Sequence, residues 1–172
     1  MELLESNSFE RISVGDIVGL SGLSSRTFYN HFRDKNELLA YLYRITVEPL
    51  WYTDGKRNSL ETFFTCGKDN FLYNGTLKGF GNALSYYGQN DLRSEIENKG
   101  VEDLVRLLNW NRFPGAITPE LREVLHFFMC GITRYFEKYY LDSKTIQVDW
   151  LYTFWINCVP AYLAEYLVKE PE

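Results

Sequence analysis

The chain has 172 residues, of which 45 % are hydrophobic and 17 % aromatic, and this composition excludes an intrinsically disordered protein. Its formal net charge of −5 is unusual for a nucleic-acid-binding protein, because Lys and Arg contacts to phosphate dominate that affinity. The three cysteines, Cys66, Cys130 and Cys158, lie within apolar helical patterns. Their odd number and the lack of a signal-peptide pattern predict reduced thiols in the cytoplasm rather than a disulfide framework.

The chain begins with a segment that is weakly patterned for a helix. Met1–Glu5 provides roughly one helical turn, and Ser6–Ser8 breaks it. We expect Phe9 and Ile12 to pack beside Ile17 in the next helix.

Residues 13–22 carry the signals of a short helix. Ser13 is an N-cap, and Asp16 in the first turn suits the helix dipole. Ile17 and Leu20 lie three residues apart on one face. Gly22 can adopt the left-handed conformation that ends a helix cheaply.

A second short helix follows almost at once. Ser24 is its N-cap, and Phe28 and Phe32, four residues apart, turn inward together. Two short helices joined by a Gly-containing turn predict a helix-turn-helix, whose second helix enters the major groove of DNA. The outward face of that second helix comprises Ser25, Arg26, Thr27, Tyr29, Asn30 and His31.

The third helix of this region is longer. Asp34 and Glu37 form a predicted capping box, and Pro49 predicts a kink or an early stop near residue 48. We expect its buried stripe to comprise Leu38, Leu39, Leu42, Ile45 and Leu50.

The motif Thr27–Phe32, followed by Asp34-Lys35 and Leu38-Leu39, resembles the DNA-binding domain of the TetR family of transcriptional regulators, with a specific match over Ser13–Leu42. The resemblance implies a homodimer whose C-terminal helical domain binds a small molecule or partner and thereby controls DNA binding. Family members have a longer first helix, so either this chain starts internally or its domain is natively short. We therefore expect a less stable domain and weaker DNA binding.

The expected DNA contacts combine the resemblance with side-chain chemistry. Arg26 can donate two hydrogen bonds to O6 and N7 of a guanine, or it can contact a phosphate. Tyr29 and His31 resemble the family's phosphate-contacting pair, and Lys35 adds a cation near a helix start. The full set is Ser24, Ser25, Arg26, Thr27, Tyr29, Asn30, His31 and Lys35.

The remaining sequence also reads as helical, so we predict an all-α chain. Residues 51–58 form the expected boundary between a DNA-binding domain (1–50) and a helical ligand-binding and dimerisation domain (51–172). The predicted helices of the second domain cover residues 59–73, 76–84, 91–108, 118–143 and 145–168, with Thr118-Pro119 as a strong helix start.

The last predicted helix, 145–168, is apolar nearly all round. Asn157, Pro160 and Glu165 within it argue against a membrane span, and Pro160 should kink it. A helix buried on several faces needs several partners, so we expect the 118–143 and 145–168 helices of two subunits to form a four-helix dimer interface. The candidate interface residues are Gly131, Tyr135, Phe154, Trp155, Cys158 and Tyr162.

Aromatic residues of the second domain are candidates for an effector cavity, although aromatics at helical spacing are more often plain core. Tyr86 and Trp110 are preferred because they lie near predicted helix ends, where a polar tip can meet a ligand. The candidate set is Phe63, Phe64, Tyr86, Trp110, Phe127 and Phe128.

The chemistry of the sequence favours a regulator over an enzyme. We find no catalytic set, and with His31 and His126 as the only histidines we find no His/Cys metal spacing, so we predict no metal and no cofactor. The predicted function is a ligand-responsive repressor that binds palindromic double-stranded DNA as a homodimer, without a membrane. The alternative is a protein-binding adaptor that has kept the fold and lost tight DNA binding.

Overall fold

The computed structural model describes residues 2–53, 56–57, 59–63, 65, 76–88, 91–143 and 148–168. The predicted all-α fold is confirmed, with one short antiparallel ladder between β1 (Tyr52–Thr53) and β2 (Lys56–Arg57) in the segment predicted as a boundary. The helices are α1 (Glu2–Ser6), η1 (Phe9–Arg11), α2 (Val14–Ser21), α3 (Ser25–His31), α4 (Lys35–Val47), η2 (Glu48–Trp51), α6 (Thr76–Leu84), α7 (Leu92–Trp110), α8 (Pro119–Ser143), α9 (Val148–Cys158) and α10 (Ala161–Leu167), where η marks a 3-10 helix.

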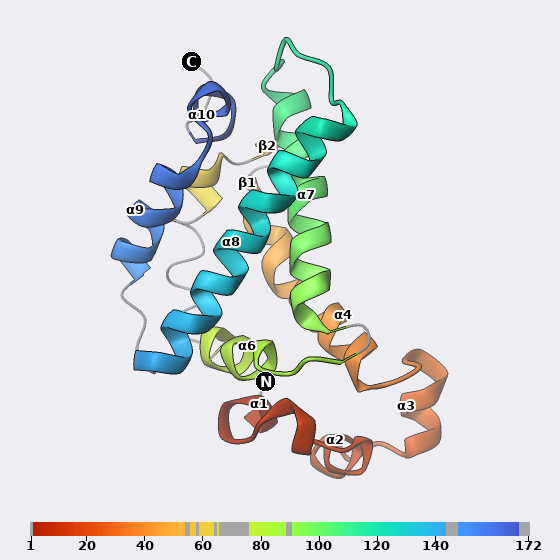
Figure 1. Ribbon diagram of the computed structural model, residues 1–172. Coiled ribbons are helices and arrows are strands. Elements are labelled where there is room, and N and C mark those ends of the chain that lie inside the picture. The colour runs from red at the N-terminus through yellow and green to blue at the C-terminus, as the bar shows by residue number, and fades with distance from the viewer. Residues whose placement is uncertain are drawn as a thin grey trace.

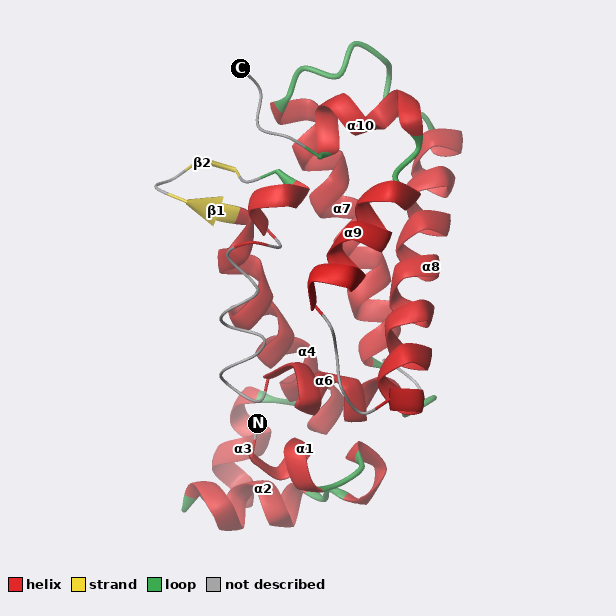
Figure 2. Cartoon of the chain, turned by 90° about the vertical axis from the view of Figure 1, so that its left-hand side faces the viewer, coloured by secondary structure: helices red, strands yellow, loops and turns green. Residues whose placement is uncertain are grey.

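The small N-terminal helices and the long helices occupy different ends of the molecule. In Figure 1, α1, α2 and α3 lie along the bottom, and α4 leads from them towards the long helices. The long helices α7 and α8 pack against each other, while α1 packs against α6. Figure 2 shows the same division from the side, with α1–α3 below and α7, α8 and α9 above. The helix α6 therefore lies between the two ends.

Local signals set the boundaries of the helix-turn-helix as predicted. The Ser13 side chain accepts from the Asp16 backbone N–H, and Asp16 accepts from the Ser13 N–H, which completes a capping box at the start of α2. Gly22 ends α2 in the left-handed region, with φ 68°. Ser24 caps α3 by accepting from the Thr27 N–H at 3.0 Å. The chain therefore turns between α2 and α3 where the sequence requires it.

The start of α4 differs slightly from the predicted capping box. Asp34 Oδ1 accepts from the Asn36 and Glu37 N–H groups, both at 2.9 Å. Glu37 Oε2 accepts from the Arg33 N–H at 2.6 Å, one residue earlier than in the predicted box. The predicted stop near Pro49 is confirmed, because α4 ends at Val47 and the 3-10 turn η2 contains Pro49.

The predicted buried stripe of α4 is wrong at Ile45, which is 51 % exposed. Leu39 and Val47 are buried, and Tyr43 packs against the core between them. These three residues are four apart and define the inward face, so Ile45 falls two residues out of register and points to solvent.

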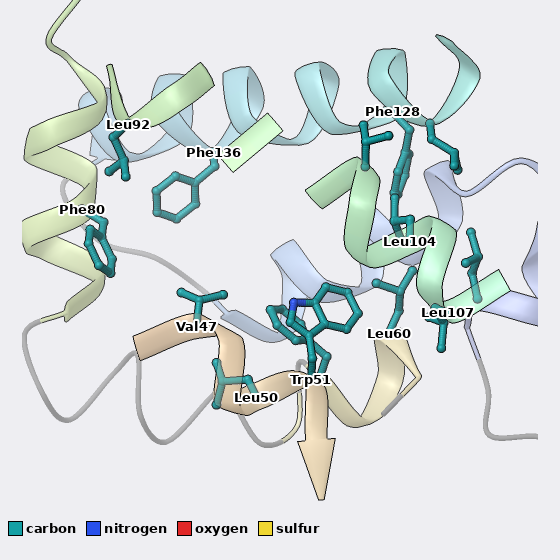
Figure 3. Close-up of a cluster of buried hydrophobic side chains, with 14 of the residues drawn as sticks. Val47, Leu50, Trp51, Leu60, Phe80, Leu92, Leu104, Leu107, Phe128 and Phe136 are labelled. Carbon is teal, nitrogen blue, oxygen red and sulfur yellow. The ribbon is translucent and has the colours of Figure 1, made fainter. Parts of the chain in front are cut away.

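The core is built mainly from leucines of the long helices. Figure 3 shows side chains from α4, η2, α6, α7 and α8 pointing into one shared interior. The least exposed leucines are Leu84, Leu92, Leu104, Leu107, Leu108, Leu125, Leu163 and Leu167. Burial of this apolar surface, rather than local capping, holds the upper helices together.

The last predicted helix is two helices. Pro160, at φ −53° and ψ 129°, separates α9 from α10, because it supplies no N–H and excludes a helical residue before it. The break lets α10 pack against α7, with Leu163 and Leu167 buried. Among the described residues, no helix combines the length and the apolar character that crossing a bilayer requires. Most of the helix predicted over 59–73 lies outside the described residues.

Candidate DNA-contacting surface and ligand cavity

The outward side of α3 is exposed along its length. We call Ser25, Arg26, Tyr29, Asn30 and His31 the α3 face, and all five residues are exposed. Tyr29 is 58 % exposed, whereas Phe28 on the inward side is only 5 % exposed. Figure 1 places α3 at the outer edge of the molecule, with only the short α2 and the start of α4 beside it. The predicted DNA-contacting residues of α3 are thus accessible to a large partner.

Aromatic packing fixes the orientation of this short helix. The Phe28 ring lies 5.3 Å from the Tyr29 ring in an edge-to-face arrangement and 5.7 Å from the Phe32 ring. The Phe32 ring in turn lies 5.5 Å from Tyr41 of α4. Because α3 is too short to be stable alone, these ring contacts and the Ser24 cap hold it.

Two hydroxyls predicted to contact DNA are engaged in the cap. The Ser24 and Thr27 hydroxyl oxygens are 2.9 Å apart and share a hydrogen bond. The Ser24 oxygen also accepts the Thr27 backbone N–H. The structure therefore gives Ser24 and Thr27 a helix-starting role whether or not they also touch DNA.

Lys35, which the sequence predicted to contact a phosphate, makes its hydrogen bonds within the protein. Its Nζ donates to the carbonyl oxygens of Phe9 at 2.8 Å, Glu10 at 3.1 Å and Ile12 at 2.7 Å. It also lies 4.6 Å from the centre of the Phe9 ring, in a cation–π contact. Partial burial lowers the pKa of the Lys35 ammonium. With three donors and three carbonyls, this ammonium ties η1 to α4.

The N-terminal helices are attached to α6 by two further contacts. Asn82 Nδ2 of α6 donates to the Leu4 carbonyl at 2.7 Å. The Phe9 ring packs edge-on against Tyr86, at 5.3 Å. Tyr86, a preferred candidate for the effector cavity, therefore contacts the N-terminal helices instead.

A cavity of about 150 Å³ lies between the long helices, α4 and α6. Of the predicted ligand contacts, Phe63 and Phe128 line it. Most of its walls are apolar side chains. The complete lining is Tyr43, Val47, Trp51, Leu60, Phe63, Phe80, Leu84, Ile96, Gly100, Asp103, Leu104, Phe128, Met129, Ile132, Thr133, Phe136, Leu151, Tyr152 and Trp155.

Two other predicted cavity residues, Phe127 and Trp110, lie on the surface. Phe127 is 82 % exposed because it is adjacent to the inward-facing Phe128 and points about 100° away around α8. Trp110, 55 % exposed, is the last residue of α7, beyond the cavity. Phe64 lies outside the described residues. The structure thus corrects the positions of Phe127 and Trp110.

Polar groups gather on one part of the cavity wall. Burial, with the nearby carboxylates of Asp103 and Glu95, raises the pKa of the Tyr43 phenol far above its usual range, so Tyr43 is neutral. Asp103 is 3 % exposed and lies 3.5 Å from Lys99 Nζ and 3.4 Å from Arg106 Nη1. A phenol and a carboxylate that already carries two ion pairs therefore lie in the wall of a mostly apolar cavity.

A buried ion-pair network joins three of the helices around the cavity, α6, α7 and α8. Glu137 of α8, 1 % exposed, accepts from Arg93 at 2.8 Å and Arg134 at 2.6 Å. The Tyr87 hydroxyl donates to its other oxygen at 2.7 Å, and Arg93 Nη2 also donates to the Leu84 carbonyl at the end of α6. The network connects α6, α7 and α8.

The predicted dimer contacts fall on two kinds of position. Gly131, Cys158 and Tyr162 are exposed. Tyr135 and Phe154 are half-buried and stack on each other at 4.5 Å between α8 and α9. Trp155 is half-buried and lines the cavity.

One group of potential metal ligands was missed in the sequence. Glu97 of α7 and His126 and Cys130 of α8 each offer a ligand atom, and these atoms all lie within 4.8 Å of one another. The statement that no His/Cys spacing exists is therefore wrong, because His126 and Cys130 are one helical turn apart. Burial and the Glu97 carboxylate raise the pKa of the Cys130 thiol.

Comparison with known proteins supports the interpretation of the N-terminal helices. The family model of bacterial regulatory proteins, tetR family, matches residues 1–42. The HTH-type dhaKLM operon transcriptional activator DhaS of Lactococcus lactis subsp. lactis (strain IL1403) is 38 % identical over 42 residues. That match covers 24 % of this chain and 22 % of the relative. Residues 1–42 of this chain, which fold as a helix-turn-helix, therefore match the TetR family of bacterial regulators.

Proposed function

We propose that this protein is a transcriptional regulator that binds a palindromic operator as a homodimer through the α3 face and responds to a small molecule in the cavity. The observation that carries the proposal is the exposure of Arg26, Tyr29 and His31 on a helix whose Phe28 is buried. With Phe28 packed on the inward side, the three outward side chains of this short helix offer a cation and hydrogen-bond donors to a partner.

Local charge favours DNA even though the whole chain is acidic. Residues 24–33 contain Arg26 and Arg33 and no acidic residue. In the proposed complex Arg26 reads a guanine edge, while Tyr29 and His31 donate to phosphates. A neutral imidazole keeps one N–H donor, so His31 can donate to a phosphate without carrying a charge.

The proposed dimer uses α8, α9 and α10, where large apolar side chains remain exposed. The exposed residues include Phe127 at 82 %, Tyr162 at 57 % and Trp150 at 42 %. An aromatic ladder also lies there, with Trp150 stacked on Tyr139 at 5.2 Å and on Phe154 at 5.5 Å. In the proposed dimer, the two α3 faces should lie about 34–36 Å apart, one turn of DNA, or a multiple of that.

The response to an effector is proposed to run through α4 and α6. Both helices line the cavity, through Tyr43 and Val47 of α4 and through Phe80 and Leu84 of α6. Both also hold the N-terminal helices, since α4 carries Lys35 and α6 carries Asn82. A ligand that moves either helix thereby changes the position of the α3 face, and DNA and ligand affect each other's affinity reciprocally.

The cavity also limits the chemistry of the proposed effector. An apolar cavity of about 150 Å³ holds a molecule of roughly benzene size. The neutral Tyr43 phenol favours a ligand with one hydrogen-bonding group at the edge of an apolar body. We expect a small aromatic or branched aliphatic alcohol or amine to fit better than a sugar or a nucleotide.

We propose that the chain divides into a DNA-binding domain at residues 1–50 and an effector-binding and dimerisation domain at residues 51–172.

The proposed sign of regulation is repression. The similar Lactococcus protein is described as an activator. That similarity covers only 24 % of this chain and 22 % of the relative, so it does not carry the sign of regulation over to this protein. Transcription from an operator-bearing template, with and without the protein, separates the two.

The function is tested by selecting duplexes from a random-sequence library with the full chain. The expected result is an inverted repeat whose half-sites are centred about 10 base pairs, or a multiple of that, apart. Affinity for the selected duplex should fall with salt, with a slope equivalent to several phosphates. No binding to duplex DNA even at low salt would contradict the proposal and favour the protein-binding adaptor.

A further inference from the structure

A mixed group of metal-binding side chains lies on the α7–α8 pair, away from the α3 face. Glu97 comes from α7, and His126 and Cys130 come from α8. The Cys130 Sγ lies 3.8 Å from the His126 Nε2, and the three ligand atoms lie within 4.8 Å of one another. Nothing in the DNA-binding proposal uses these three residues.

The spacing of the residues explains why their ligand atoms converge. His126 and Cys130 are four residues apart, so they share one face of α8. The helices α7 and α8 pack along their length, and this packing brings Glu97 opposite that face. Two helices that are each internally rigid therefore present an imidazole, a thiol and a carboxylate to one point.

The separations suit a tetrahedral ion. Zinc binds Cys sulfur at about 2.3 Å and His nitrogen or carboxylate oxygen at about 2.0–2.2 Å, which puts neighbouring ligand atoms about 3.5 Å apart. The observed distances of 3.8 Å and at most 4.8 Å are close to that separation, so small side-chain rotations would bring the three atoms onto one ion. Imidazole with thiolate is also the donor combination that favours zinc over magnesium or calcium.

We propose that Glu97, His126 and Cys130 form a zinc site that joins α7 to α8 and leaves a fourth position for water or another ligand. Three protein ligands with one open position form an established type of zinc coordination. The proposal goes beyond DNA binding and does not depend on it.

The site lies on the same pair of helices as the cavity. Ile96, next to Glu97, and Met129, next to Cys130, both line the cavity. The helices α7 and α8 contact each other at this level, because the Met129 side chain lies where a Cβ at Gly100 would stand. A bound zinc ion would fix the separation of α7 and α8 here and thereby the width of the cavity.

The test is zinc binding by the full chain, stripped with a chelator and kept reduced without added thiols. Isothermal titration with zinc chloride should give one ion per chain. Cobalt chloride should give the near-ultraviolet absorption of a thiolate–cobalt bond. All proteins carry Cys66→Ser, because Cys66 lies outside the described residues.

Three variants and one control examine the ligands separately. Cys130→Ser, His126→Gln and Glu97→Gln should each weaken zinc binding by more than the roughly 10- to 100-fold loss typical of removing an outer hydrogen-bonding partner of a metal ligand. Cys158→Ser, which removes the exposed thiol of α9, is the matched control and should bind zinc as the parent does. Circular dichroism without metal checks that each variant folds, and the isosteric Glu97→Gln keeps the test valid should Cys130→Ser misfold.

Zinc should also raise the melting temperature of the parent and of Cys158→Ser, because a ligand that binds the folded state stabilises it. The increase should be smaller for Cys130→Ser, His126→Gln and Glu97→Gln. The proposal is overturned if the parent binds no zinc at micromolar concentration, or if the three variants bind it as tightly as the parent. A loss confined to Cys130→Ser would also overturn it, because that result indicates a thiol binding alone.

Discussion

The N-terminal region with the helix-turn-helix (residues 2–33) and the long-helix body, formed by α6, α7, α8, α9 and α10, are stabilised in different ways. In residues 2–33 the buried side chains among the described residues are Leu4, Phe9, Ile12 and Phe28, and none of the eight residues of α2 is buried. In the body, the leucines of α6, α7, α8 and α10 whose side chains the structure describes are almost completely buried. The first region depends on caps, on the Lys35 contacts and on docking to α6, whereas the second depends on apolar burial.

This difference indicates which region moves more easily. Regions with few buried apolar contacts open at lower free energy than densely packed ones. The helix-turn-helix is held by side chains of α4 and α6, and both of these helices also line the cavity. Substitutions of polar residues should therefore loosen the helix-turn-helix locally, while the body should resist all but the loss of buried groups.

The largest expected effect is in the body, at its buried carboxylate. Replacing Glu137 by Ala leaves Arg93, whose side chain is 15 % exposed, without its ion-pair partner. Breaking a buried pair in this way costs about 3–5 kcal/mol in the free energy of unfolding, measured by urea denaturation.

The control for that prediction is Glu102→Ala. It breaks the 2.7 Å pair with Arg122, in which both side chains are more than two-fifths exposed, and should cost about 1 kcal/mol or less. Equal losses in the two variants would show that the buried network does not hold the body.

The next largest effect is expected at Lys35. Lys35→Met removes the ammonium that donates to the carbonyls of Phe9, Glu10 and Ile12. Hydrogen bonds of charged groups contribute about 1.5–3 kcal/mol, so η1 and α2 should open more readily by that amount. Hydrogen exchange should show the loss in residues 2–33 and not in α7. Lys138→Met, at an exposed position of α8, should leave both regions unchanged.

A smaller effect is expected at the start of α3. Ser24→Ala removes the acceptor of the Thr27 N–H and should destabilise the helix-turn-helix by about 1 kcal/mol. Ser25→Ala, one residue later, changes the first residue of the helix rather than its cap and should have little effect on stability. The amide exchange rate of Thr27 distinguishes the two variants, and similar rates would contradict the capping role.

The smallest effect is a pH dependence of α2. Hydrogen bonds from the Ser13 hydroxyl and backbone lower the pKa of Asp16. A carboxyl with a lower pKa in the folded state contributes stability above its unfolded pKa of about 3.9, and the contribution disappears as pH falls through the folded pKa. The protection factor of the Ser13 amide, which is the exchange rate of an unstructured chain at the same pH divided by the observed rate, should fall on acidification, and Asp16→Asn should remove that dependence.

The sequence predicted those features that depend on neighbouring residues. The caps at Ser13 and Ser24, the left-handed Gly22 and the break at Pro49 were all predictable, because their partners lie within four residues. Pro160 predicted a kink, and the structure has a complete break, which lets α10 turn onto α7.

The features that were missed depend on packing between distant segments. Lys35 reaches carbonyls 23 to 26 residues away, so its spacing gave no signal. Glu97 joins His126 and Cys130 only because α7 packs on α8, although the His-x-x-x-Cys spacing itself was visible. Helix ends were a poor guide to the cavity, because residues of α4, η2, α6, α7, α8 and α9 all contribute to its wall, and Tyr86 packs on Phe9 instead.

The most direct test of the account concerns the α3 face and uses two arginines at opposite ends of the molecule. Arg26 lies on α3, and Arg112 is exposed in the loop between α7 and α8 at the top of Figure 1. Binding of a selected duplex is measured by fluorescence anisotropy at several salt concentrations for Arg26→Gln, Arg112→Gln and the parent. We expect Arg26→Gln to lose affinity worth about 1–3 kcal/mol with its fold intact, and Arg112→Gln to bind as the parent does. Equal affinity of the two variants for that duplex would contradict the assignment of the α3 face to DNA.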